Sequence, residues 1–255
     1  MNILRIERLK LAAKRGTWWA IALLIILMAG IAVTTTSATL SDQRFNIVSA
    51  YVGFQWLMLV LIVVAASCVA MEFEYGTIKQ LAVQAKNRWQ VYLTKFSLIL
   101  GYDVCLHVLV VLVTLGLRPI FNPKIDMFAN YQHQLSLLSN LMINSFLDFY
   151  GSLMIIGLVF LLASVGHSSA IAISVGVAVC FLGEGVSSLA LSTFKALAVV
   201  LRWNPFNMMC LQEQYANQDY QGITHLTLAQ LAGGNLMWTV ISIGVGALIF
   251  SKRHI

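Results

Sequence analysis

The stretch at residues 71–95, MEFEYGTIKQLAVQAKNRWQVYLTK, decides how this chain is organised. It is a long polar interruption between two apolar runs, and Glu72 and Glu74 stand where the first run ends. Gly76 and Thr77 then supply a flexible break and a candidate cap for a short amphipathic helix. Joining two membrane helices needs only a few polar residues. We therefore expect this connection to hold a helix with a task of its own.

The composition indicates a membrane protein. Hydrophobic residues make up 59% of the 255 residues and charged residues only 10%, whereas soluble domains carry roughly a quarter charged residues. Such a chain exposes more apolar surface than a water-soluble core can bury, so its solvent is the lipid bilayer. The net charge of +6 does not indicate a nucleic-acid partner, because the bases cluster at the ends of apolar runs.

The cysteines predict neither a disulfide framework nor a metal site. Cys68, Cys105 and Cys180 fall within apolar runs, and Cys210 stands alone in a polar segment. Their spacing resembles no zinc motif. No metal is expected.

Six apolar runs are long enough to cross a bilayer, which needs roughly 20 residues each. The predicted fold is therefore an all-α membrane protein. We expect a single membrane domain over residues 1–255, with spans at about 18–40, 51–70, 91–117, 141–165, 170–190 and 233–250.

Residues 1–15 hold five bases against one acid, Glu7. At helical spacing, Ile3, Ile6 and Leu9 share one arc, which favours a short helix lying on the inner membrane surface. The alternative is a basic anchor without a defined helix. The first span resembles a secretory signal at its end, but it is long and further spans follow, so we expect it to be retained.

The segment before the last span departs from the simple pattern. Residues 194–203 are apolar but reach only about half the length needed to cross, and they end at Asn204 and Pro205. Backbone that is not helical at membrane depth must be shielded by protein. We expect a broken element here, either re-entrant or interfacial, on the outer side.

Counting bases predicts the orientation. Cytoplasmic connections carry an excess of Lys and Arg. With both termini on one side, that side holds Arg5, Arg8, Lys10, Lys14, Arg15, Lys79, Lys86, Arg88, Lys95, Lys252 and Arg253. The other side holds Arg44, Arg118, Lys124, Lys195 and Arg202. Both termini and the 71–95 stretch are therefore expected in the cytoplasm.

No catalytic motif is found in the chain. It has no Gly-Lys dipeptide and hence no phosphate-binding P-loop, and it has no His-Glu-x-x-His zinc motif. The run from Gly166 to Ser169 faintly resembles a rhomboid serine motif but lacks the second glycine. We expect no enzyme activity, no catalytic residue and no cofactor bound by this chain.

Apart from Lys95 near the start of the third span, four ionisable residues lie within the predicted spans, where a charge at the bilayer centre costs roughly 2.5–3.5 kcal/mol by insertion scales. Asp103 and His107 are four apart and share a helix face; they form either a substrate path or proton-sensitive pair, or a structural pair within the bundle. Asp148 is expected to pair with a base near the outer rim, again as a path residue or a structural one.

Glu184 lies on a small-residue stripe that lets another helix approach closely. Its functional interpretation is the outer end of a translocation path beside a two-fold axis, and the alternative is ordinary packing within the subunit. The stripe consists of Ser168, Ala172, Gly176, Cys180, Glu184 and Ser188.

The pattern Glu-x-Glu-x-Gly-Thr-Ile-Lys-x-Leu, followed by Arg88 and by Lys95 at the next span, resembles the first cytoplasmic loop of type-2 ABC transporter permeases. The broken element before the last span is similar to one in the same family. The resemblance implies that the loop is a coupling helix docking on a separate ATPase subunit. The residues implied in coupling are Glu72, Glu74, Gly76, Thr77, Ile78, Lys79 and Leu81. The alternative for the two acids is that they are solvated interfacial charges.

The resemblance implies a permease subunit in a bacterial cytoplasmic membrane, in contact with membrane lipids, paired with a second copy as a homodimer and driven by partner ATPases that bind the ATP. It implies export of a hydrophobic or amphipathic substrate such as a peptide, because small permeases of this kind resemble bacteriocin and toxin-peptide exporters. One alternative is an ion-gradient-driven transporter or channel using Asp103, His107 and Glu184, although the inverted repeats typical of that class are not found. Another is a structural or signalling protein whose loop recruits a soluble partner.

Overall fold

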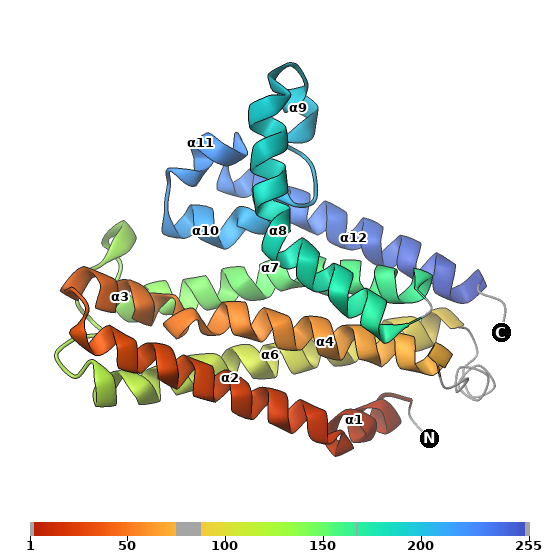
Figure 1. Ribbon diagram of the computed structural model, residues 1–255, viewed down its shortest axis with the longest axis horizontal. Coiled ribbons are helices and arrows are strands. Elements are labelled where there is room, and N and C mark those ends of the chain that lie inside the picture. The colour runs from red at the N-terminus through yellow and green to blue at the C-terminus, as the bar shows by residue number, and fades with distance from the viewer. Residues whose placement is uncertain (1–2, 75–87, 167, 253–255) are drawn as a thin grey trace. The chain divides into compact units, whose positions relative to one another are not determined.

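The computed structural model describes residues 3–74, 88–166 and 168–252. Most of these residues are helical and none of them forms a β-strand, which confirms the all-α fold; one isolated bridge joins Asn130 and Ser136. The long helices are α1 (Ile3–Ala13), α2 (Arg15–Thr34), α4 (Gly53–Glu74), α6 (Arg88–Phe121), α7 (Leu137–Val165), α8 (Ser169–Thr193) and α12 (Leu228–Lys252). Figure 1 shows their order along the chain.

Short helices connect these long ones. They are η1 (Thr35–Ser37), α3 (Leu40–Val48), η2 (Ala50–Val52), η3 (Gln132–Gln134), η4 (Lys195–Leu197), α9 (Ala198–Leu201), η5 (Asn207–Cys210), α10 (Leu211–Ala216) and α11 (Tyr220–Thr224).

Six segments of the described chain are long and apolar enough to cross a membrane. They are Arg15–Ser37, Ala50–Glu74, Trp89–Phe121, Leu137–Val165, Ser169–Thr193 and Leu228–Lys252. Each overlaps one predicted span, and most extend a few residues further at their ends. The predicted first span differs most, because it runs to Leu40, which is the first residue of α3. The side chain of Thr39 accepts a hydrogen bond from the Asp42 amide and so starts a new helix there.

The chain forms two compact units, and four of the helices contribute to both. Unit 1 comprises the described residues of Met1–Lys10, Leu61–Leu100 and Tyr150–Ile255, and unit 2 those of Leu11–Val60 and Gly101–Phe149. The boundary passes through α1, α4, α6 and α7.

Unit 1 is held together by an aromatic cluster that draws on four helices. The Tyr92 ring of α6 lies 5.5 Å from Phe160 of α7 and 5.5 Å from Phe250 of α12. Phe250 also meets Phe73 of α4 at 5.3 Å. Such pairs add about 0.5–1.5 kcal/mol each beyond their buried area. This cluster fixes the ends of α4 and α12 and the start of α6.

The short helices of unit 1 gather at the C-terminal end of α8 and the N-terminal end of α12 (Figure 1). The Trp238 indole donates to the carbonyl of Trp203 at 2.9 Å. Within the group, Thr224 donates to the Gln214 amide oxygen at 2.6 Å, and both side chains are buried. A break in the helices therefore coincides with buried polar side chains that bond one another, in agreement with the predicted broken element.

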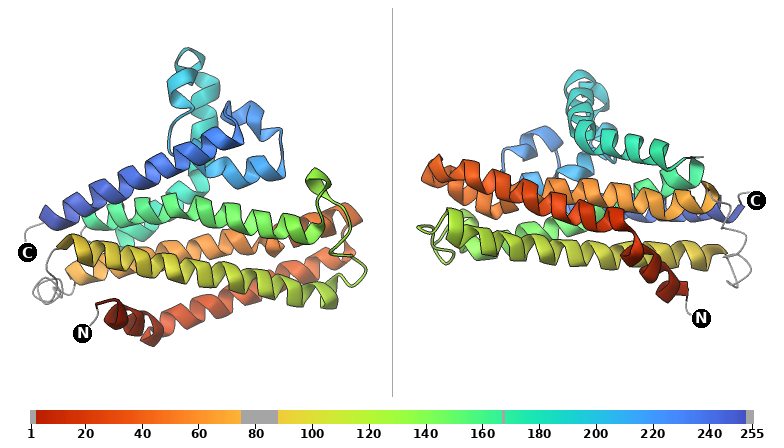
Figure 2. Two further views of the ribbon diagram at one scale, coloured as in Figure 1. Left: turned by 180° about the vertical axis from the view of Figure 1, so that it is seen from behind. Right: turned by 60° about the horizontal axis from the view of Figure 1, so that its bottom comes forward.

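Unit 2 contains α2, α3 and the adjoining parts of α4, α6 and α7. At one end of the unit, the connection between α6 and α7 lies near α3 in all three views (Figure 2). There the buried Tyr51 hydroxyl donates to Asn122 at 2.8 Å. The chain reaches α4 through a left-handed turn, since Ala50, Tyr51 and Val52 have φ of 54°, 50° and 62°.

Candidate functional site

A network of four charged side chains lies in unit 1 and joins three helices. The Lys95 ammonium of α6 lies 2.7 Å from Glu7 of α1 and 3.0 Å from Glu72 of α4. Lys10 of α1 contacts the same two carboxylates, each at 3.0 Å. We call Glu7, Lys10, Glu72 and Lys95 the ion network.

Three members of the ion network are buried, and this decides what the network can do. Lys95 is 1% exposed, Glu7 3% and Glu72 6%. Buried charges persist only when they are paired and hydrogen-bonded. Burial alone lowers the pKa of the half-exposed Lys10, but hydrogen bonds and attraction from Glu7 and Glu72 outweigh this effect, and the pKa of Lys10 is raised. The four charges sum to zero, so α1 is fixed to α4 and α6 without leaving a net charge.

Glu74 makes a separate contact within unit 1. Its carboxylate accepts the backbone N–H of Ser169 at 2.5 Å and the Ser169 hydroxyl at 3.0 Å. Ser169 is the first residue of α8, and Ser168 caps this helix by accepting from the Ala170 amide. A carboxylate at a helix N-terminus pairs with unsatisfied N–H groups and the positive end of the dipole. The end of α4 is thereby linked to the start of α8.

The predicted coupling residues fall partly outside what can be described. Gly76, Thr77, Ile78, Lys79 and Leu81 lie outside the described residues. Glu72 and Glu74 are described, and both bond within the chain. Their predicted contact with a partner stays a prediction.

Unit 2 holds the second polar cluster, formed by Asp103, His107 and Asp148. The His107 Nδ1 atom lies 2.9 Å from the Asp103 carboxylate and 3.0 Å from the Asp103 carbonyl oxygen. The Nε2 atom lies 3.0 Å from the Asp148 carboxylate. The rings of Phe54 and Phe149 lie 6.1 Å and 5.7 Å from the imidazole. We call these three polar residues the Asp–His–Asp triad.

The triad brings together three of the four ionisable residues predicted within the spans. Asp103 and His107 share a helix face, as their spacing predicted. The base that pairs with Asp148 is His107, so the expectation of a base near the rim is wrong for this contact. Asp103 is completely buried, and Asp148 is 9% exposed.

Glu184 belongs to unit 1 and lies on α8. Its carboxylate is hydrogen-bonded to the Tyr220 side chain of α11. The pKa of Tyr220 is raised, mainly by burial and to a smaller extent by the nearby carboxylates of Glu184 and Glu213. On the predicted small-residue stripe, a Cβ added at Gly176 would come within 2.9 Å of Ile62 on α4 and 3.1 Å of Val159 on α7. The stripe therefore packs within the chain at this point.

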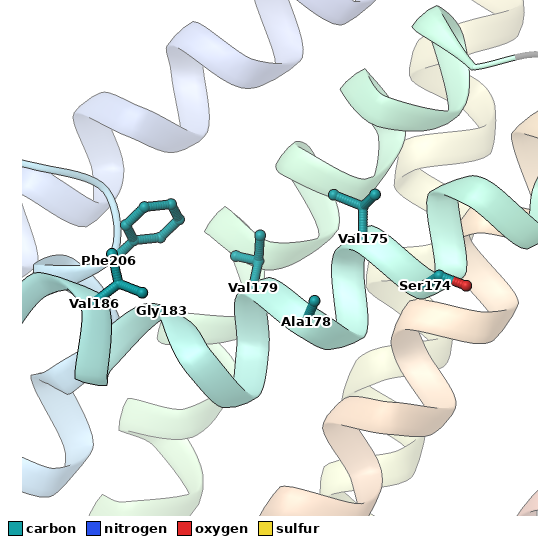
Figure 3. A pocket seen from close by; sticks show the side chains of 7 residues that line it. All are labelled: Ser174, Val175, Ala178, Val179, Gly183, Val186 and Phe206. Atoms are coloured by element: carbon teal, nitrogen blue, oxygen red, sulfur yellow. The ribbon is translucent and has the colours of Figure 1, made fainter.

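A shallow apolar groove runs along α8 in unit 1. Its volume is about 360 Å³, and the lining is Ser174, Val175, Ala178, Val179, Gly183, Val186 and Phe206. Figure 3 shows these side chains in a row along the helix, with the Phe206 ring beside Gly183. Only 17% of the apolar window of α8 is buried, less than for the other candidate spans of the described chain.

Sequence reasoning missed the contacts that join distant segments. Glu7 was visible as the sole acid among the first fifteen residues, but its partner Lys95 is 88 positions away. Among the described residues, no group of His, Cys, Asp and Glu side chains could hold a metal ion.

Comparison with protein families gives one match. A family model described as ABC-2 family transporter protein matches residues 3–183, which include both polar clusters, the first four candidate spans and the first part of the fifth. A search of curated proteins found no match.

Proposed function

Since this chain belongs to the ABC-2 transporter family, we propose that it pairs with a second copy and with two cytoplasmic ATPase subunits to export a hydrophobic or amphipathic substrate. That the chain is a membrane subunit of an ABC transporter follows from the family and from its six membrane-capable helices. The partners, the direction and the substrate are the proposal. The family match over residues 3–183 is the observation that carries it.

In this proposal residues 71–95 receive the motion of the ATPase. ATP binding closes the two ATPases, and the loops turn this closure into rigid-body movement of the spans. Glu72 and Lys95 lie near the two ends of this stretch and are ion-paired to each other and to α1. The buried Lys95, paired with Glu72, holds the two ends of residues 71–95 together. This supports transmission of the ATPase motion to the spans as a rigid-body movement, without bending at the ends of the loop.

Assembly with an ATPase gives the direct test. The tagged chain, expressed with a P-loop ATPase encoded beside it, is expected to co-purify with that subunit and to change its rate of ATP hydrolysis. Replacing Leu81 with Asp and Lys79 with Glu is expected to abolish both effects, because docking uses an apolar side chain and a complementary charge.

Lys124→Glu is the matched control, since it makes the same charge change in the connection between α6 and α7, on the predicted outer side. It should leave assembly and hydrolysis unaltered. Full assembly in the Lys79 and Leu81 variants would reject the coupling assignment.

The exposed face of α8 supports the homodimer. Six large apolar side chains on this helix are exposed: Ile171, Val175, Phe181, Leu182, Val186 and Leu189. The small residues Ser174 and Ala178 on the same helix also line the groove, and small residues let two membrane helices approach closely. In a background without native cysteines, Ala178→Cys is expected to form a disulfide between copies in native membranes. Val108→Cys on α6, also exposed, is the control that should remain monomeric on the gel.

The substrate class follows from the apolar surface and the resemblance to small peptide exporters. The α8 groove offers apolar contact and one hydroxyl, from Ser174, to an amphipathic segment. Transport of a labelled amphipathic peptide into inverted vesicles should require ATP. Peptide uptake that persists without ATP and follows an imposed ion gradient would favour the alternative transporter class that uses Asp103, His107 and Glu184.

A further inference from the structure

The hydrogen-bond geometry of the Asp–His–Asp triad determines where one proton of His107 lies. The Nδ1 atom of His107 faces the Asp103 backbone carbonyl at 3.0 Å. A carbonyl oxygen can only accept a hydrogen bond, so Nδ1 must carry hydrogen. The Asp103 carboxylate oxygen 2.9 Å from the same nitrogen stabilises that arrangement.

The opposite nitrogen shares a single proton with Asp148. At 3.0 Å, either Nε2–H donates to the Asp148 carboxylate or a protonated Asp148 donates to Nε2. With Asp103 ionised, the first arrangement is an imidazolium between two carboxylates, and the second is a neutral imidazole with one carboxylate. Both arrangements contain the same number of protons, but the Asp103 carboxylate 2.9 Å from Nδ1 favours the imidazolium, so we take the first arrangement, in which neither carboxyl group is protonated, as the state before any further proton binds. Both leave the three side chains with one negative charge.

The surroundings of this charge are apolar. Phe54 of α4 and Phe149 of α7 pack on the imidazole. The residues of α2 after Arg15 and the part of α4 in unit 2 contain no acid, Lys, Arg or His. The titratable side chain of η2, just before α4, is Tyr51, which donates to Asn122. On α6, Tyr102 and Cys105 flank Asp103, and Arg118 is eleven positions beyond His107, about 16 Å along a helix.

We propose that the triad is a proton-binding site that takes up one further proton on a carboxylate of Asp103 or Asp148. The proton comes from hydronium in the aqueous solvent, which becomes water, and it ends on a carboxylate oxygen, so no bond to carbon changes and nothing is oxidised. Uptake removes the surplus charge and leaves an imidazolium, one carboxylate and one carboxylic acid. Two carboxylates within reach of one base disfavour full ionisation of both.

Proton uptake makes the packing of α6 against α7 in unit 2 depend on pH. The three residues on these two helices are held by one another, so the surplus charge opposes the contact and its neutralisation favours it. A proton rather than a metal is the ligand, because both ring nitrogens are already engaged. This inference does not rest on the ATPase partner, and it stands or falls separately from the proposed function.

Infrared spectroscopy of the purified full chain in nanodiscs tests the site directly. Lowering the pH from about 8 to about 5, the range in which histidine networks titrate, is expected to add a carboxylic-acid C=O band from a buried group that exchanges slowly with deuterated solvent. Asp103→Asn and Asp148→Asn should each lose this band. Asp126→Asn, an exposed acid in the connection between α6 and α7, is the matched control and should keep it.

Stability measurements separate the proton site from a merely structural triad. At the alkaline end, each single Asn variant already has a neutral pair, so it should unfold at the same temperature as the wild type or above it. His107→Gln leaves two carboxylates without a base and should unfold at the lowest temperature of the set. The advantage of the Asn variants over the wild type should shrink as pH falls, because only the wild type gains a proton.

Two results would overturn the proposal. One is a wild-type chain without a new carboxylic-acid band over this pH range, which needs no variant to fold. The other is a pair of Asn variants that are destabilised equally at both ends of the range, as loss of an ordinary hydrogen bond would produce.

Discussion

At the scale of single residues, Lys95 is notable because a charged side chain lies in a buried environment. Lysine is almost never fully buried unless it is paired, yet Lys95 is 1% exposed and contacts two carboxylates. From the sequence it was one more base marking the cytoplasmic side. Its partner Glu7 lies 88 positions away, and no local pattern reports a pairing over that distance.

Removing the Lys95 charge should be costly. Lys95→Met leaves Glu7 and Glu72 buried with less compensation, and breaking a buried pair in this way costs about 3–5 kcal/mol. Lys10→Met removes a side chain that is 48% exposed and should cost about 1 kcal/mol or less. Thermal unfolding of the purified chain in detergent measures both. Equal losses for the two variants would show that burial does not govern the ion network.

Two glycines of α12 provide a matched pair for testing its packing in unit 1. A Cβ at Gly246 would collide with the Tyr92 hydroxyl and lie 3.2 Å from the Leu161 Cα atom, whereas a Cβ at Gly244 meets nothing within 4 Å. Gly246→Ala should therefore destabilise by about 1–3 kcal/mol. Gly244→Ala should gain about 0.5–1 kcal/mol from helix propensity. If unfolding temperatures shift alike in both, the packing of α12 on Tyr92 is incorrect.

Cys210 provides a test by chemical labelling. Burial, and then the carboxylates of Glu184 and Glu213, raise the pKa of its thiol. Because the thiolate is the reactive form, less of it is present at a given pH than for an ordinary cysteine. Maleimide labelling of Cys210 should stay slow as the pH is raised through the usual thiol range. It should become fast when the chain is denatured, and equal rates in both states would contradict the burial.

At the scale of elements, the long helices could be predicted and the short ones could not. A membrane span can be recognised in a sequence by its length and apolar composition, and each of the six predicted spans has a matching helix. The helix α3 lies mostly between the first two predicted spans, where no helix was predicted; it has only nine residues and contains Ser41, Asp42 and Asn46. Its start depends on the Thr39 cap, which only the folded backbone makes visible.

The left-handed turn before α4 was likewise beyond prediction, because Ala50, Tyr51 and Val52 are unusual residues for positive φ. Each such residue costs about 1–2 kcal/mol for L-amino acids. Tyr51 offsets part of that cost, since its ring is buried and its hydroxyl bonds Asn122.

Glycine at position 52 should relieve strain. Val52→Gly removes a β-branched side chain from φ of 62°, and after the entropic cost of glycine we expect a net gain of about 0.5–1 kcal/mol. Val33→Gly in the regular helix α2 is the control and should lose about 0.5 kcal/mol. Unfolding temperatures of the two variants should therefore move in opposite directions, and a loss at both positions would argue against the turn.

At the scale of the whole molecule, composition and charge predict more than pairing does. The apolar content indicated a membrane subunit, and the family match agrees. The orientation stays a prediction, as does the single domain over residues 1–255. The candidate sites could be predicted only in part from the sequence. The spacing of Asp103 and His107 places them on one helix face, whereas the position of Asp148 beside them depends on how α6 and α7 pack.

Labelling from outside the cell tests the orientation. Lys124→Cys, in the connection between α6 and α7, should react with a maleimide that cannot cross membranes. Arg5→Cys, on the exposed side of α1, should react only after the membrane is permeabilised. The excess of bases on one side is the physical reason. The reverse pattern would place residues 71–95 outside the cell and exclude an ATPase from reaching them.

The two acids at the end of α4 have one further consequence. Glu72 and Glu74 are two positions apart, so they project about 200° from each other around the helix. One carboxylate reaches α1 and α6, and the other reaches α8. Inserting one alanine just before Glu72 turns both by about 100°, so neither finds its partner. An insertion that adds no charge and deletes none would thereby break the polar contacts of α4 with α1, α6 and α8, because both carboxylates would point away from their partners.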